Sequence, residues 1–133
     1  MIDTNILLDI YVFQDPHGAA LKAHVLSGQV LPVASDETNA EFVDVLAREK
    51  FGLSSEVQAS ILADWRSRST LWDANQILPA PWRCKDKDDQ KFLDLAYSTR
   101  PCLLVSKDKQ VLRFAKRALR EGVTIVPTSN LGV

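Results

Sequence analysis

The chain has 133 residues, of which 46% are apolar, so residues 1–133 are long enough to form a single domain with one buried core. A net charge of −1 and a charged fraction of 25% exclude a disordered chain and a globally basic nucleic-acid binder. Two cysteines are too few for a disulfide framework. Neither a signal peptide nor an apolar run of membrane-spanning length is visible. The sequence therefore predicts a cytoplasmic protein with no membrane partner.

In the first half of the chain, the apolar spacing and the positions of Pro and Gly predict short strands that alternate with helices. The predicted elements are a very short strand ending at Asp3, a mostly buried helix after it, a helix over 16–27, a strand over 29–34 and a helix from about 36 to 52.

The second half continues this alternation. A helix carries apolar residues at helical spacing over 57–65, and residues 71–82 are expected to form a short strand and an irregular connection. The stretch 86–108 combines an acidic turn, a short helix, a fully apolar strand and a further acid, and it is followed by a helix over 109–121 and a strand over 123–126. An apolar strand without polar alternation is typical of a parallel sheet that is covered on both faces. The predicted fold is therefore α/β, a three-layer α/β/α domain with a mainly parallel central sheet.

Four acids are placed so that their side chains can converge where the parallel strands end. Asp3 and Asp108 each follow an apolar strand, and Glu41 and Asp89 are predicted in first turns of helices that face the same edge. Each acid alone has an ordinary explanation, because Asp3, Asp89 and Asp108 suit helix caps and Glu41 suits a solvated helix face. Together, the four carboxylates would repel one another unless a cation lay among them, and Mg²⁺ or Mn²⁺ prefers such oxygen ligands. A site of this kind suits phosphodiester hydrolysis.

Other catalytic chemistries find less support in the sequence. The five glycines are scattered singly, so no phosphate-binding glycine loop is present, and His17 and His24 lack a neighbouring nucleophile motif. Cys84 and Cys102 have no metal-ligand spacing.

A basic stripe is predicted on the helix that follows Asp108. Its residues recur at helical spacing opposite the apolar face, and with Lys107 they are the candidate RNA-binding residues: Lys107, Lys109, Arg113, Lys116 and Arg117. A solvated helix face is the alternative explanation for this stripe. The three tryptophans could stack on bases, although core or dimer packing is the commoner role of such residues.

These residues resemble the PIN-domain ribonuclease family. The resemblance begins at Asp3-Thr4-Asn5, includes Glu41 within Asn39-Ala40-Glu41-Phe42, and continues through the pattern D-x-D-D-x-x-F-L-x-x-A at 86–96. It ends at the apolar strand followed by Ser106-Lys107-Asp108. The central pattern is similar to that of a PIN subfamily assigned to the toxins of toxin–antitoxin systems.

The resemblance implies a function and a set of site residues. Asp3, Glu41, Asp89 and Asp108 would be the catalytic, metal-binding acids, and the auxiliary polar residues would be Asn5, Asp86 and Ser106. The implied activity is a Mg²⁺- or Mn²⁺-dependent endoribonuclease that cleaves single-stranded RNA, with a homodimeric state and an antitoxin protein as partner. Asp86 also suits a turn, and Asp88 suits a cap of the helix that carries Asp89.

The start of the chain leaves an alternative function open. Members of this family usually carry a full apolar strand before the D-T-N opening, whereas only Met1 and Ile2 precede it here. Either these two residues form a stub of that strand or the native chain begins further upstream. The alternative is a catalytically silent PIN-fold module that binds RNA or a protein partner.

Overall fold

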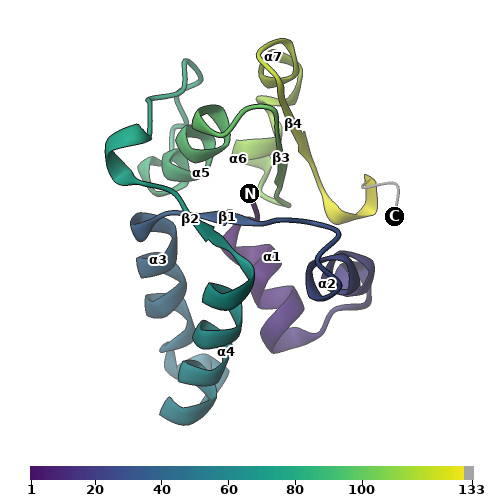
Figure 1. Ribbon diagram of the computed structural model, residues 1–133, viewed down its shortest axis with the longest axis vertical. Coiled ribbons are helices and arrows are strands. Elements are labelled where there is room, and N and C mark those ends of the chain that lie inside the picture. The colour runs from purple at the N-terminus through teal and green to yellow at the C-terminus, as the bar shows by residue number, and fades with distance from the viewer. Residues whose placement is uncertain (131–133) are drawn as a thin grey trace.

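The computed structural model describes residues 1–130 as helices that surround short parallel strands (Figure 1). The helices and strands are α1 (Thr4–Leu8), α2 (Ala19–Leu26), β1 (Val33–Ala34), α3 (Asp36–Leu46), α4 (Ser55–Arg68), β2 (Thr70–Leu71), α5 (Lys87–Ser98), β3 (Cys102–Val105), α6 (Lys109–Leu112), α7 (Ala115–Arg120) and β4 (Val123–Val126). A π-helical segment, Asp9–Phe13, continues α1, and four 3₁₀ turns lie at Pro16–Gly18, Glu49–Phe51, Ala74–Gln76 and Thr128–Asn130.

Every strand pairing within residues 1–130 is parallel. β3 pairs with β4 in the register Cys102↔Val123, and β1 pairs with β2 in the register Val33↔Thr70. On the other side of β3, Ile2 forms a parallel bridge with Val105. The stub before Asp3 therefore does act as a very short strand beside β3.

Alternate residues of these strands point into two different cores, and this alternation creates the three layers. Met1 and Leu104 are buried in the core beneath α5, α6 and α7, whereas Ile2 and Val105 are buried in the core formed with α1, α3 and α4. Side chains that alternate between the faces of a strand require helices on both faces. The structure thus confirms the predicted α/β architecture with parallel strands.

Three predicted elements differ from the structure. The strand predicted over 29–34 is reduced to Val33–Ala34, because the backbone N–H groups of Gln29 and Val30 donate to the carbonyl of His24 and close α2 instead. The helix predicted to reach Gly52 ends at Leu46, and Gly52 instead adopts a positive φ of 61° after a separate 3₁₀ turn.

The predicted helix over 109–121 is divided into α6 and α7 by a turn at Arg113–Phe114. Within α7 Ala118 is the buried residue, and Leu119 is 62% exposed. No helix within residues 1–130 is both long enough and apolar enough to cross a membrane.

Candidate active site

Asp3 and Asp108 are linked by a serine at the carboxyl ends of the N-terminal stub and β3. The N–H of Asp3 donates to the carbonyl of Val105 (3.0 Å), which places the Asp3 side chain just beyond the strands. Ser106 follows β3 and is fully buried, and its hydroxyl donates to Oδ2 of Asp3 (2.6 Å) and accepts the N–H of Asp108 (3.1 Å). Ser106, predicted as an auxiliary residue, therefore orients one acid and the backbone of another.

Asp89 joins this pair from the first turn of α5, as the sequence predicts. Asp86 caps the helix by accepting the N–H of Asp88 (2.9 Å), so Asp86 has the turn role and Asp88 is not the cap. The Asp89 side chain is hydrogen-bonded to that of Asp108. The charge of Asp108 opposes ionisation of Asp89, because two neighbouring carboxylates repel each other.

The raised pKa values of Asp89 and Asp3 indicate that the predicted acids lie near one another. Burial, the hydrogen bond to Asp108 and the charges of Asp108, Asp86 and Asp3 raise the pKa of Asp89 from 3.8 to about 7. Burial also raises the pKa of Asp3, against the opposing effect of the Ser106 hydrogen bond, and the charges of Glu41 and Asp108 raise it further. The four predicted acids therefore lie within electrostatic reach of one another.

Glu41 reaches the site from the middle of α3, not from its first turn. α3 begins at Asp36 after the Ser35 cap, so Glu41 lies one turn later than the sequence-based placement. Its carboxylate accepts a hydrogen bond from Thr4 Oγ1 at one oxygen and contacts Lys91 Nζ (3.0 Å) at the other. Thr4 and Lys91 were not among the predicted site residues, although Thr4 belongs to the D-T-N opening and Lys91 lies two positions after Asp89.

The remaining predicted residues lie around this centre. The Asn5 side chain is exposed, and its backbone N–H makes a long hydrogen bond to Oδ1 of Asp3 (3.4 Å). Lys107 is paired with Asp9, a buried acid of the π-helical segment that the sequence analysis did not select, with Nζ 3.0 and 2.9 Å from its two carboxylate oxygens. The basic residues of α6 and α7 and the turn between them, Lys109, Arg113, Lys116 and Arg117, are all exposed.

The carboxylates of these acids are suitable ligands for a divalent cation, although their side chains are not arranged as a complete coordination site. Among residues 1–130, no three His, Cys, Asp or Glu side chains are already arranged as a metal site. Burial and the neighbouring acids nevertheless raise the pKa of Asp89 to about 7, and buried Asp3 also has a raised pKa. Carboxylate oxygens are hard ligands, and a divalent cation competes with a proton for them.

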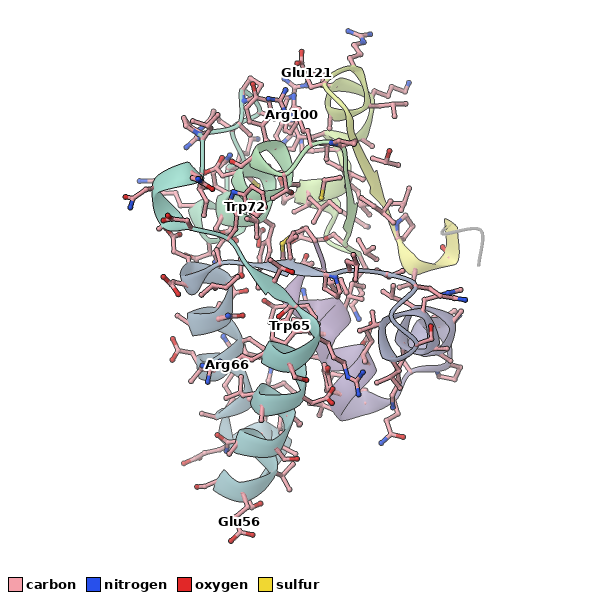
Figure 2. All side chains as sticks on the ribbon, viewed as in Figure 1. Glu56, Trp65, Arg66, Trp72, Arg100 and Glu121 are labelled. Atoms are coloured by element: carbon pink, nitrogen blue, oxygen red, sulfur yellow. The ribbon has the colours of Figure 1, made fainter. Side chains whose placement is uncertain are left out.

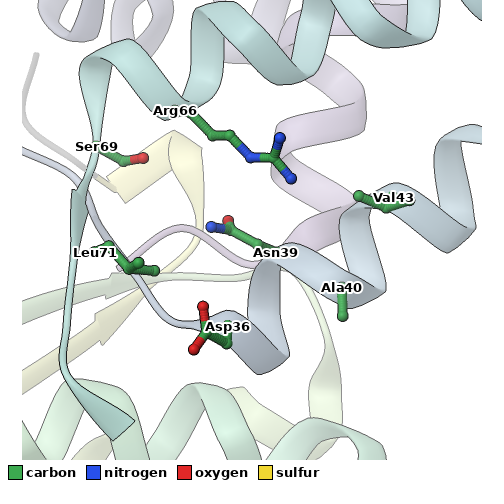
Figure 3. Close-up of a pocket in the computed structure, with 7 residues that line it drawn as sticks. All are labelled: Asp36, Asn39, Ala40, Val43, Arg66, Ser69 and Leu71. Atoms are coloured by element: carbon green, nitrogen blue, oxygen red, sulfur yellow. The ribbon is translucent and has the colours of Figure 1, made fainter.

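One hollow of the structure is not lined by Asp3, Asp89 or Asp108. Residues of α3, of α4 and of the segment that follows α4 enclose about 540 Å³ beside Arg66 and Asn39 (Figure 3). A second groove of about 430 Å³ shares Ala40 with it and contains Glu41 and Lys91. The candidate site is therefore assigned by the position of the interacting carboxylates at the strand ends, and not by the size of a cavity.

The raised pKa of Asp89 leads to an expected pH dependence of stability without metal. A carboxyl group whose pKa is higher in the folded than in the unfolded chain binds more protons when folded, so stability falls as the pH rises from about 4 to about 7. We expect the melting temperature of chelator-treated protein to fall over this interval. The Asp89→Asn variant should show a smaller fall and melt higher than wild type at about pH 8.

Circular-dichroism melts across this pH interval provide the measurement. Asp73→Asn is a matched control, because Asp73 is exposed and caps a 3₁₀ turn, a role that Asn can keep. Equal pH dependence in wild type and Asp89→Asn would contradict the expectation.

Comparison with known families finds a match for this chain. A family model described as PIN domain matches residues 1–110, a range that contains Asp3, Glu41, Asp89 and Asp108. No curated protein and no solved structure matches the chain. PIN domains have a three-layer α/β/α fold and are generally nucleases that act on RNA and typically use divalent metals. Because the match covers most of the chain, the protein belongs to the PIN-domain family.

Proposed function

We propose that the protein is a divalent-metal-dependent endoribonuclease that hydrolyses phosphodiester bonds of single-stranded RNA. The observation that carries this proposal is the close Asp89–Asp108 pair, joined to Asp3 through Ser106 at the end of the parallel strands. Acids so placed in a PIN domain fit a site that binds Mg²⁺ or Mn²⁺, with Asp3, Glu41, Asp89 and Asp108 as its acidic residues.

Each of these site residues then has a defined part. Asp3, Glu41, Asp89 and Asp108 would hold the cation, and Ser106 keeps Asp3 oriented by donating to its Oδ2 (2.6 Å). A divalent ion held there would lower the pKa of a water molecule and offset charge on the phosphate. Lys109 is exposed at the start of α6, directly after Asp108, and would contact the RNA backbone there.

RNA binding would depend on local rather than net charge. The chain has a net charge of −1, but Arg113 after α6 and Lys116 and Arg117 of α7 are exposed. The guanidinium of Arg117 lies over the ring of Phe114 (4.8 Å to the centroid), which steadies its direction. Phosphate contacts from such residues bind without reading the RNA sequence.

The biological setting follows from the subfamily resemblance of the pattern at 86–96. We propose that the protein is the toxin of a type II toxin–antitoxin pair, acting in the cytoplasm as a homodimer until an antitoxin protein blocks the acidic site. Asn5 and Asp86 are auxiliary here, since the N–H of Asn5 donates to Asp3 and Asp86 caps α5.

Cleavage of end-labelled single-stranded RNA by the purified full chain tests the function. We expect cleavage with Mn²⁺ or Mg²⁺ and none after chelation, with internal fragments that identify an endonuclease. A duplex RNA of the same sequence is the substrate control. RNA binding without cleavage under any of these metal conditions would overturn the proposal and favour the silent binding module.

A further inference from the structure

Two neighbouring residues after β3 hold the two ends of α1. The hydroxyl of Ser106 donates to Oδ2 of Asp3 (2.6 Å), the residue that caps the start of this helix. Nζ of Lys107 donates to both carboxylate oxygens of Asp9 (3.0 and 2.9 Å), the residue at which the helix ends. The turn at residues 106–108 is therefore attached to α1 at two points, about 9 Å apart along the helix at a rise of about 1.5 Å per residue.

Within this pair the acid depends on the lysine more than the lysine depends on the acid. The Asp9 side chain is 10% exposed, whereas that of Lys107 is 51% exposed. A carboxylate so far withdrawn from water needs a close counter-charge, and the ammonium of Lys107 supplies one to both of its oxygens. A phosphate that drew Lys107 away would leave the Asp9 carboxylate buried without this counter-charge. The structure therefore opposes the RNA-binding role that the sequence predicts for Lys107.

Directional contacts of this kind decide how α1 is oriented against the turn. The apolar side chains of α1 are buried, but hydrophobic burial is non-directional and does not by itself fix the angle of the helix. Ser106 supplies one directed contact, and its Oγ also accepts the N–H of Asp108 (3.1 Å). The contact between Lys107 and Asp9 supplies the second. Asp9 is also the first residue of the π-helical segment, a rare conformation found frequently at functional sites.

We propose that Lys107 is a positioning residue, whose contact with Asp9 fixes the turn at residues 106–108 against α1 and so aligns the acids at the strand ends for RNA cleavage. Lys107 then makes no phosphate contact, and the RNA backbone is left to exposed Lys109 and the basic residues that follow it. The proposal rests on the proposed function for the reaction itself. It adds an ion pair, outside the set of four acids, on which the rate of that reaction depends.

The two roles of Lys107 predict different effects of Asp9→Asn on the steady-state cleavage of labelled single-stranded RNA by the full chain with Mn²⁺. If Lys107 contacts phosphate, removing the charge of Asp9 frees its ammonium for RNA, so KM falls and kcat is kept. If the pair positions the acids, kcat falls by about tenfold or more and KM stays within about twofold, since a misplacement near 1 Å can cost about 10²-fold. We expect the loss in kcat.

Three further variants separate the contact from a general charge effect. Asp15→Asn is the matched control and should keep the wild-type kcat, because Asp15 lies within electrostatic reach of Lys107 but its carboxylate caps a 3₁₀ turn at the N–H of His17 instead. Lys107→Arg should keep most of the wild-type kcat, since a guanidinium can donate two hydrogen bonds to one carboxylate. Asp9→Asn/Lys107→Met should be no slower than Asp9→Asn, because residues that act as one unit are non-additive.

The salt dependence of RNA binding, measured by fluorescence anisotropy without divalent ions, tests the assignment independently of cleavage. Each phosphate contact that is lost lowers the slope of log affinity against log salt by about 0.7 for a single strand. Asp9→Asn/Lys107→Met removes the pair as a neutral unit and should keep the wild-type slope, whereas Lys109→Met should lower it. Circular dichroism of each variant shows that the folded chain is being compared.

The possible failures are distinguishable. An active wild type whose Asp9→Asn variant keeps the wild-type kcat would overturn the role assigned to Lys107 while the nuclease stands. A lower salt slope in the double variant would do the same. If Asp9→Asn does not fold, the kcat of the double variant decides by the same criterion. Wild-type protein that cleaves no RNA would overturn this proposal together with the proposed function.

Discussion

Replacing Asp108 by Asn is expected to reduce the proposed metal-dependent RNA cleavage by about 10²-fold or more, because the proposed site would lose a ligand and several kcal/mol of charge stabilisation. The fold should persist. Asp108 caps α6 by accepting the N–H of Gln110 through Oδ1 (2.8 Å), and an Asn carbonyl oxygen can accept the same hydrogen bond. The neutral side chain also removes charge repulsion with Asp89 in the metal-free protein.

Initial cleavage rates on labelled single-stranded RNA, at matched protein and Mn²⁺ concentrations, provide the measurement. Glu56→Gln is a suitable control, because Glu56 is an exposed acid at the far end of α4 from the strands (Figure 2). Retained cleavage by Asp108→Asn, with the control equally active, would show that the acids at the strand ends are not the catalytic centre.

Replacing Trp65 by Ala is expected to destabilise the protein by about 3–5 kcal/mol, the usual cost of removing a large buried aromatic side chain. Trp65 is 2% exposed and is the only buried residue of α4. Its indole N–H donates to Oδ1 of Asn39 (3.1 Å), so the same side chain ties α4 to α3. Because α3 also carries Glu41, loss of this anchor should disturb the acidic site as well.

Urea unfolding followed by circular dichroism measures this effect. Trp65→Phe is the matched variant, because it keeps an aromatic ring and removes the donor to Asn39, at an expected cost of about 1–3 kcal/mol. A loss in Trp65→Ala no larger than in Trp65→Phe would mean that α4 is held by other contacts. The half-buried Ile61 and Leu62 and the hydrogen bond from Tyr11 to Asp64 (2.7 Å) are those contacts.

Short sequence patterns were sufficient to predict an element where neighbouring residues determine its structure. The apolar strand at 102–105 depends on a few neighbouring positions and lies where the sequence predicts. The cap of α5 is Asp86 and not Asp88, although the sequence suits either residue for a role at this turn. The strand expected at 29–34 did not form over its full length, because the carbonyl of His24 at the end of α2 accepts hydrogen bonds from its first backbone N–H groups. Helix ends are decided by such competition, which spacing alone does not reveal.

The sequence by itself determined the α/β class with parallel strands and the order of the four acids, because strand and cap patterns are short-range. Only the tertiary structure decided what those acids contact. Lys91 meets Glu41 across 50 positions of the chain, Lys107 meets Asp9 across 98, and Ser106 meets Asp3 across 103. These partners are brought together by parallel pairing and by helices packed on both faces of β3, so no local pattern of residues could have assigned them.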